Sequence, residues 1–223
     1  MATTSLLGLT LILSPAALTA LRIAPLLTST ASLTHGYMEW VTTSSFLGPA
    51  PLDTAINRIV LGADAPSSKV AAGAIAQGTD AKTEKDKSLE RANQIVVPYW
   101  FTKFFNTAVF SVVGLNSMTL IAASCNLLIP SEHPAWEGSK SFYTAGLVAA
   151  VGHYAFVPFV GKSVRGLIGT CIERASDGRE TGEDGKAVEW VREWVGWHKV
   201  RMGTVDVVAW GCFAWGVVGA LTV

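Results

Sequence analysis

The sequence predicts an all-α integral membrane protein, a bundle of four helices that cross the bilayer. Half of the 223 residues are hydrophobic and only 15% are charged, whereas about 25% charged residues is usual in a water-soluble domain. The chain also has eight tryptophans, a residue that is enriched where helices leave the membrane. Four long stretches are nearly free of charge, which is typical of a membrane domain with several spans.

Each of these stretches is long enough to cross the bilayer as a helix, since about 20 residues rising 1.5 Å each cover about 30 Å of hydrocarbon. We expect one membrane domain with spans at about residues 6–33, 101–129, 142–160 and 203–223. Two polar stretches lie between the spans, at residues 77–93 and 173–188. We expect solvated loops there, with a short surface helix as the alternative for the first.

The first apolar stretch is interrupted by Arg22 and two prolines. Small residues near Ala20 resemble a cleavage site, so a cleaved signal peptide is the alternative to a span, although no basic segment precedes the apolar run. In a span, we expect Arg22 near the cytosolic end, where its long side chain can reach the interface or pair. We expect residues 35–60 to lie along the membrane surface.

Lysine and arginine fall mainly in the first and third connections between the expected spans, and the short middle loop holds only Lys140. Basic loops remain on the cytosolic side of a membrane. We therefore place the two long connections in the cytosol. Both termini and the loop at residues 130–141 are then expected on the non-cytosolic side.

A group of chemically capable residues precedes and opens the last span. Trp194, His198 and Arg201 are spaced by four and three residues, so they share one face of a helix. Asp206 lies two turns beyond His198 on roughly the same side. A base, a guanidinium and a carboxylate on one face indicate either a reaction site or an anchor at the membrane surface.

Other polar residues are expected at the same depth. Asn106 lies about one turn inside the second span and His153 about two turns inside the third, each counted from the cytosolic end. With Arg22 from the first span, polar groups from all four helices would converge on one leaflet, and each costs free energy there unless it is paired or used. We expect Asn116 and Asn126 to lie outside this cluster.

Structural interpretations of the same residues stay open. The tryptophans around Trp194 suit an interfacial aromatic belt, and His153 or Asn106 can serve only to hydrogen-bond neighbouring helices. Asp206 can simply pair with Arg201. The three cysteines are isolated and no helical pair of histidines has metal-ligand spacing, so we expect no metal site. A formal net charge of zero gives no indication of a nucleic-acid partner, and the sequence does not decide the oligomeric state.

Three segments carry a resemblance: VVPYWFTKFFN at residues 96–106, HYAFVPFVGKSVRGLI at 153–168 and WVGWHKVR at 194–201. Together with the four-span layout, they resemble the anthrone oxygenase-like family, small membrane proteins common in fungal polyketide gene clusters. The third segment is similar to the W-x-x-x-H-x-x-R pattern that precedes the last span in that family. The resemblance implies an integral membrane protein of the endoplasmic reticulum or another endomembrane.

The resemblance also implies an activity in secondary-metabolite biosynthesis. The protein would be a monooxygenase that oxidises an anthrone-type aromatic polyketide to a quinone, with molecular oxygen as co-substrate and no further cofactor. Deprotonation of the acidic methylene would start the reaction, with His198 as the expected base and His153 as the second choice. Arg201 would stabilise the enolate oxygen. Asp206 would orient His198 or balance Arg201.

The same resemblance implies a hydrophobic aromatic substrate that arrives from the lipid bilayer. Its flat rings would stack on aromatic side chains and contact one amide, the expected residues being Trp194, Trp197, Trp100 and Asn106. The alternative function is a non-catalytic four-span protein, such as a transport subunit, an organiser or an assembly factor. Such a protein would use the polar cluster only to hold its helices together.

Overall fold

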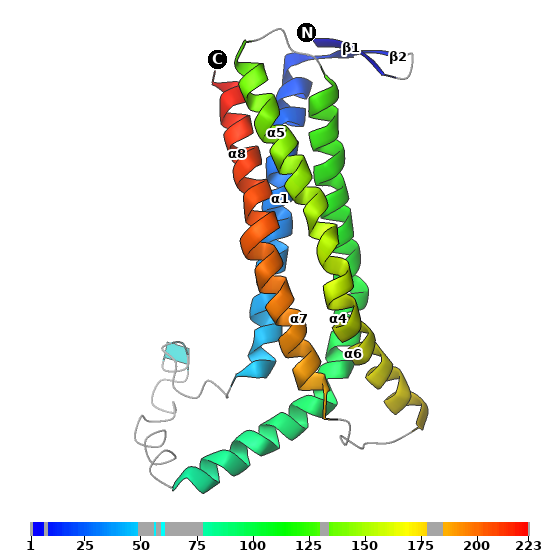
Figure 1. Ribbon diagram of the computed structural model, residues 1–223, viewed down its shortest axis with the longest axis vertical. Helices are drawn as coiled ribbons and strands as arrows, with labels where there is room; N and C mark the ends of the chain where they lie inside the picture. The colour runs from blue at the N-terminus through cyan, green and yellow to red at the C-terminus, as the bar shows by residue number, and fades with distance from the viewer. Residues whose placement is uncertain are drawn as a thin grey trace.

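The computed structural model describes residues 2–6, 9–48, 56, 59–60, 78–129, 134–177 and 185–222, and it is almost entirely helical. Four helical columns form the molecule (Figure 1). The first and second are α1 (Pro15–Ser44), followed by the 3₁₀ turn η1 (Ser45–Leu47), and α4 (Gly78–Leu128). The third is α5 (Pro134–Gly152), the 3₁₀ turn η3 (His153–Phe156) and α6 (Val157–Asp177). The fourth is α7 (Ala187–Arg201), the π-helical turn η5 (Met202–Asp206) and α8 (Val207–Leu221).

Within the described residues, four columns are long and apolar enough to cross a membrane, as predicted. The columns alternate in direction, so both termini lie at one end of the bundle (Figure 1). The helix ends that border the two basic connections lie at the other end. Both features agree with the predicted order of spans, while the side of the membrane on which each end lies stays a prediction.

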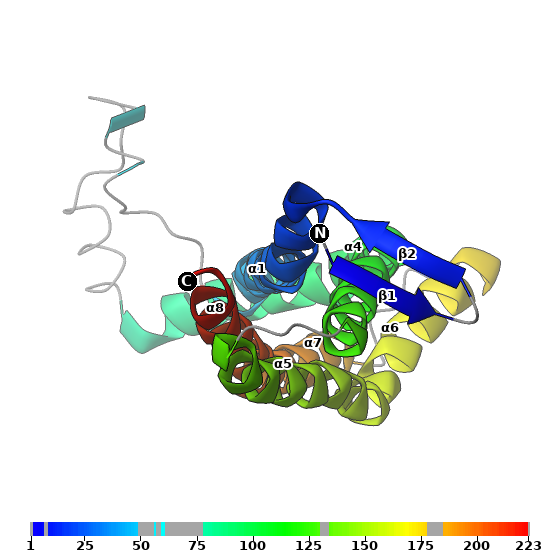
Figure 2. The same cartoon turned by 90° about the horizontal axis from the view of Figure 1, so that it is seen from above.

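The helices form a square when seen along the bundle (Figure 2). At the end that carries the termini, the most extensive packing is between α5 and α8 and between α1 and α4. At the other end, α6 packs against α7, and both also contact α4. A short antiparallel hairpin of β1 (Ala2–Leu6) and β2 (Leu9–Leu13) precedes α1.

The predicted start and end of the first span were wrong. The helix begins at Pro15 rather than near residue 6, because the Ser14 hydroxyl accepts a hydrogen bond from the Ala17 N–H and Pro15 occupies the first helical position. It then continues to Ser44, so residues 35–44 belong to the bundle and do not lie along the membrane surface. This shift moves Arg22 to the end that carries the termini.

The second helix is longer than predicted. The first part of α4, from Gly78 to about Pro98, leans away from the bundle (Figure 1). The polar stretch at 78–93 is therefore a surface helix rather than a loop. Pro98 cannot donate the backbone hydrogen bond of a regular helix, which accounts for the change of direction. In the other polar stretch, α6 reaches Asp177 and α7 begins at Ala187. Residues 77 and 178–184 lie outside the described residues.

Two apolar clusters hold the bundle, one toward each end. The cluster at the end with the basic connections contains Val97, Phe101, Leu167, Ala187, Val191, Trp194 and Val195. The cluster at the end with the termini contains Ala123, Trp136, Tyr143, Ala150, Ala209, Phe213 and Val217. A layer of buried polar side chains, which includes Asn116, His153 and His198, lies between the two clusters.

Close packing of α5 on α8 depends on Gly146. A Cβ placed at Gly146 would lie 2.7 Å from Cε1 of Phe213, whose ring is fully buried. We therefore expect Gly146→Ala to lower the free energy of unfolding by about 1–3 kcal/mol through overpacking, measured by thermal unfolding in nanodiscs. Gly138→Ala on the same helix is the control, because nothing lies within 4 Å of its Cβ position; equal stability of the two variants would contradict this packing.

Candidate functional site

An apolar cavity of about 240 Å³ opens between α1, α4, the η3–α6 junction and α7. Valine side chains of α4 and α6 form most of its wall. Its polar lining comes from three of the four columns, all except α4, and consists of Glu39, His153, Tyr154, His198 and Arg201. The indole of Trp194 also lines the cavity. A mainly apolar pocket with a few convergent polar groups is the usual form of a small-molecule site.

His153 and Asp206 form a hydrogen-bonded pair on one side of the cavity. Nδ1 of His153 lies 2.9 Å from Oδ1 of Asp206, with only 7% and 11% of the two side chains exposed. An ionised carboxylate can only accept, so Nδ1–H donates, and the lone pair of the neutral ring is then on Nε2. Pro158 lacks the N–H that a regular helix would direct to the carbonyl of Tyr154, which accounts for the 3₁₀ turn that carries His153.

Arg201 is joined to the same carboxylate by the π-helical turn. Its Nε lies 3.2 Å from Oδ2 of Asp206. Residues five apart on a regular α-helix point about 140° away from each other, since each residue turns by about 100°. The wider π turn at Met202–Asp206 brings this i, i+5 pair together, and such turns are frequent at functional sites. Asp206 therefore accepts hydrogen bonds from both His153 and Arg201.

His198 is held differently from His153. Its Nε2–H donates to the carbonyl of Gly36 at 2.8 Å, and Nε2 lies 3.7 Å from Oε2 of Glu39. The His198 ring stacks on Trp194 with centroids 4.7 Å apart. Only 2% of His198 is exposed, and its Nε2–H holds the ring against the backbone of α1, so in the neutral ring the lone pair is on Nδ1.

Glu39 brings α1 into the site. Its carboxylate lies 3.5 Å from Nδ1 of His35 on one side and near His198 on the other, and 6% of its side chain is exposed. Arg201 is the cation that interacts electrostatically with Glu39. A Cβ at Gly36 would lie 3.2 Å from Sδ of Met202, a tight contact, so the missing side chain at Gly36 eases the close approach of α1 to the fourth column.

Asn116 lies next to this cluster, contrary to the prediction that it lies outside. It lines a small cavity of about 10 Å³ together with Asp206 and hydroxyls of Ser29 and Thr119. That volume is about that of one water molecule and the lining is polar, which is what a buried water requires. Asn126 does lie outside the cluster, because its amide donates to the carbonyl of Leu21 at 2.7 Å.

The structure does not bring every expected residue to the cavity. Of the four expected substrate-binding residues, Trp194 lines it, whereas Trp197 stacks on Phe159 and Trp100 stacks on Phe104. The side chain of Asn106 is exposed, and its neighbour Phe105 lines the cavity instead. The exposed and half-buried tryptophans suit the belt interpretation better than a substrate wall.

Arg22 is also absent from the cluster, so its predicted convergence on this leaflet was wrong. Its guanidinium lies 4.4 Å from the ring centroid of Trp136 and Nη1 donates to the carbonyl of Ala220 at 3.3 Å. Both partners are at the end that carries the termini. The bounds of α1 explain the difference: the helix begins nine residues later than predicted, which puts Arg22 near its start, and ends eleven residues later, at Ser44, which brings Glu39 to the site.

Glu39, His35 and Gly36 were missed from the sequence. A signal for them does exist, because His35 and Glu39 are four residues apart, the spacing of one helix face, within an otherwise apolar stretch. Assigning residues 35–60 to the membrane surface removed that stretch from the bundle. The π turn that aligns Arg201 with Asp206 leaves no comparable pattern in the sequence.

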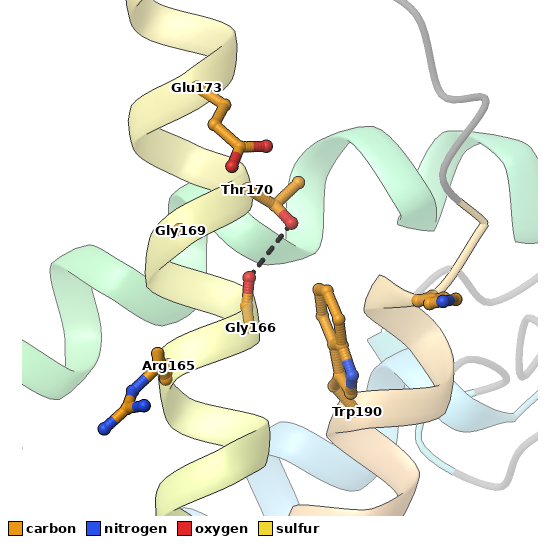
Figure 3. A pocket seen from close by; sticks show the side chains of 7 residues that line it. Arg165, Gly166, Gly169, Thr170, Glu173 and Trp190 are labelled. Carbon is orange, nitrogen blue, oxygen red and sulfur yellow. Dashed lines mark hydrogen bonds between the residues drawn. The ribbon is translucent and has the colours of Figure 1, made fainter.

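A second hollow, of about 390 Å³, lies between α6 and α7 near the basic connections. Figure 3 shows Trp190 facing Gly166, where a Cβ would come within 2.6 Å of the indole. Thr170 donates to the carbonyl of Gly166, and Arg165 points away from Trp190 (Figure 3). The polar groups do not converge on one point, so this hollow has the features of a surface groove rather than a reaction site.

Comparison with protein-family models, with curated proteins and with solved structures gives no match. The likeness to anthrone oxygenases therefore remains a resemblance of short segments.

Proposed function

We propose that the protein is a membrane-bound oxygenase that oxidises an anthrone-type aromatic polyketide to a quinone with O₂. The observation that carries this proposal is His153 on the wall of an apolar cavity inside the bundle, hydrogen-bonded behind that wall to Asp206. The cavity volume of about 240 Å³ lies just below the ~300–1,000 Å³ usual for drug-sized ligands. It suits a compact and flat molecule.

His153 is the base that the geometry favours. Asp206 fixes its tautomer, leaves Nε2 free to accept a proton and stabilises the imidazolium that results. His198, the first choice from the sequence, donates its Nε2–H to the neutral Gly36 carbonyl, so no hydrogen-bonded carboxylate stabilises its imidazolium in the way that Asp206 stabilises that of His153. In the proposal, His153 removes a proton from the methylene of the substrate, while His198 and Trp194 form the wall that supports the rings.

Arg201 supplies the positive charge near the reacting molecule. Loss of the methylene proton turns the ketone into an enolate, and a guanidinium stabilises that oxygen by a charge-assisted hydrogen bond. Its Nε is held by Asp206, which orients the planar group. Because Arg201 lines the cavity, its remaining donors suit this role.

The enolate is electron-rich and reacts with O₂ directly, so the proposed reaction needs no further co-reactant. The methylene carbon forms a bond to oxygen, the O–O bond breaks, and one oxygen atom leaves as water. For the unsubstituted anthrone the balance is C₁₄H₁₀O + O₂ → C₁₄H₈O₂ + H₂O. The protein's part is deprotonation, charge stabilisation and exclusion of bulk water.

The test is oxygen consumption by membranes that contain the protein. We expect addition of anthrone to start O₂ uptake with quinone formed in a one-to-one ratio, above the spontaneous rate in membranes without the protein. Glu189→Gln, an exposed carboxylate on α7, should leave the rate unchanged. Uptake no faster than in membranes without the protein would contradict the proposal and favour the non-catalytic alternative.

A further inference from the structure

The lining of the cavity divides into a buried end and an exposed end. Glu39, His153 and His198 form the buried polar end, with 6%, 5% and 2% of each residue exposed. Val113 of α4 and Val157 of α6 lie at the opposite end and are 46% and 56% exposed. Tyr154 and Gly161 accompany them there, so the cavity opens between α4 and the η3–α6 junction.

This opening lies within the part of the bundle that faces lipid. The third column has no charged residue between Lys140 and Lys162, and those 21 residues rise by about 30 Å, the thickness of the hydrocarbon core. Val157 and Gly161 fall inside that interval. On α4, no charged residue follows Lys103 before the helix ends at Leu128, and Val113 lies between them.

The local backbone explains why α4 and α6 separate here. The 3₁₀ turn at His153–Phe156 interrupts the third column, and below this turn α6 leans outward from the bundle (Figure 1). Short valine side chains on both helices and Gly161 leave the space between them unfilled. The buried polar groups thereby face an opening in the side of the bundle.

We propose that the ligand enters this cavity sideways from the hydrocarbon core of the membrane, through the opening bounded by Val113, Val157 and Gly161. The ligand class is a compact apolar molecule that dissolves in the bilayer and carries one polar group for the buried end. Water-soluble molecules of the same size are excluded because the opening faces acyl chains. This route rests on the proposed function in one respect, because both take the cavity as the site where the ligand binds.

Gly161→Phe tests the route by narrowing the opening. Nothing lies within 4 Å of the Cβ position at Gly161, so the new side chain has room at the mouth without displacing backbone. Gly114→Phe is the matched control, since Gly114 also has nothing within 4 Å of its Cβ position, is exposed on α4 and does not line the cavity.

The probe is a lipid-soluble aryl diazirine in phosphatidylcholine vesicles that contain the full-length protein. After photolysis, mass spectrometry locates the labelled residues. We expect label on Trp194 and His198 in the native protein and in Gly114→Phe. When photolysis follows mixing of the probe before entry is complete, the label there in Gly161→Phe should fall about tenfold, since a barrier higher by about 1.4 kcal/mol slows entry tenfold. Label on the exposed Trp215 of α8 should be equal in all three and shows that each is folded and inserted.

Unchanged labelling of Trp194 and His198 in Gly161→Phe would overturn the proposed route, as would native protein labelled only at lipid-facing residues. Stronger labelling of the buried end by a water-soluble diazirine would also overturn it. The outcome is separate from that of the oxygen-uptake test. If the buried residues are labelled but no oxygen is consumed, the entry route is supported and the proposed reaction is rejected. If oxygen is consumed but the buried residues are not labelled, the reaction is supported and the route is rejected.

Discussion

Replacing His153 by Ala is expected to lower kcat for anthrone oxidation by about 10²–10⁴-fold, the usual contribution of a positioned general base. Asp206→Asn should lower kcat by a similar factor, because an amide no longer fixes the tautomer that leaves Nε2 free and does not stabilise the imidazolium. Steady-state O₂ uptake by purified protein in nanodiscs measures both. Since the two residues act as one unit, the double variant should be little slower than either single variant.

Glu189→Gln is the control for Asp206→Asn, since it changes an exposed carboxylate on the adjoining helix in the same way. The KM of the His153 variant should change much less than kcat, because Trp194 and the valines that line the cavity are untouched. If His153→Ala kept native kcat while His198→Ala lost it, the original assignment from the sequence would hold and the present one would fall.

Replacing Arg201 by Met is expected to have the largest effect on stability. It removes the guanidinium that pairs with the buried Asp206 carboxylate and that also acts electrostatically on Glu39, and breaking a buried ion pair costs about 3–5 kcal/mol. For a chain of this length, about 3 kcal/mol lowers Tm by roughly 6–12 °C. Thermal unfolding in nanodiscs, followed by circular dichroism, measures the change.

Adding Glu39→Gln to Arg201→Met should recover part of the lost stability, because the double variant buries one uncompensated carboxylate fewer. Arg192→Met is the control, as Arg192 is an exposed cation on the same helix. A double variant less stable than the sum of the two single changes would show that Glu39 and Arg201 are not coupled through their charges.

The sequence was sufficient for the four helices and for half of the site. Long uncharged stretches impose helices of a known length on any chain that enters a bilayer, so the number of spans followed from composition alone. His198, Arg201 and Asp206 were correctly grouped because they lie close together in one helical column. His153 joined them because its depth in the third span could be counted from a basic loop.

The other half of the site depends on structural features that the spacing of apolar and polar residues in the sequence does not reveal. The start of α1 is set by the Ser14 cap and Pro15, and the helix runs to Ser44; both ends were predicted about ten residues too early, so Arg22 was expected at the site and Glu39 was not. The direction of each tryptophan around the helix was equally decisive, since Trp194 faces the cavity while Trp197 stacks on Phe159. The rotation of a helix about its axis is set by packing against its neighbours. When a helix is apolar on most of its faces, its sequence does not show which face points to the neighbours.

Hydrogen–deuterium exchange at the methylene of anthrone, measured by NMR without O₂, tests the central claim most directly, because it isolates proton removal from the later reaction with oxygen. The native protein in D₂O is expected to speed exchange above the spontaneous rate, and His153→Ala and Asp206→Asn should lose that acceleration. Exchange no faster with the native protein than without it, or equally fast in the His153 variant, would contradict the assignment of His153 as the base.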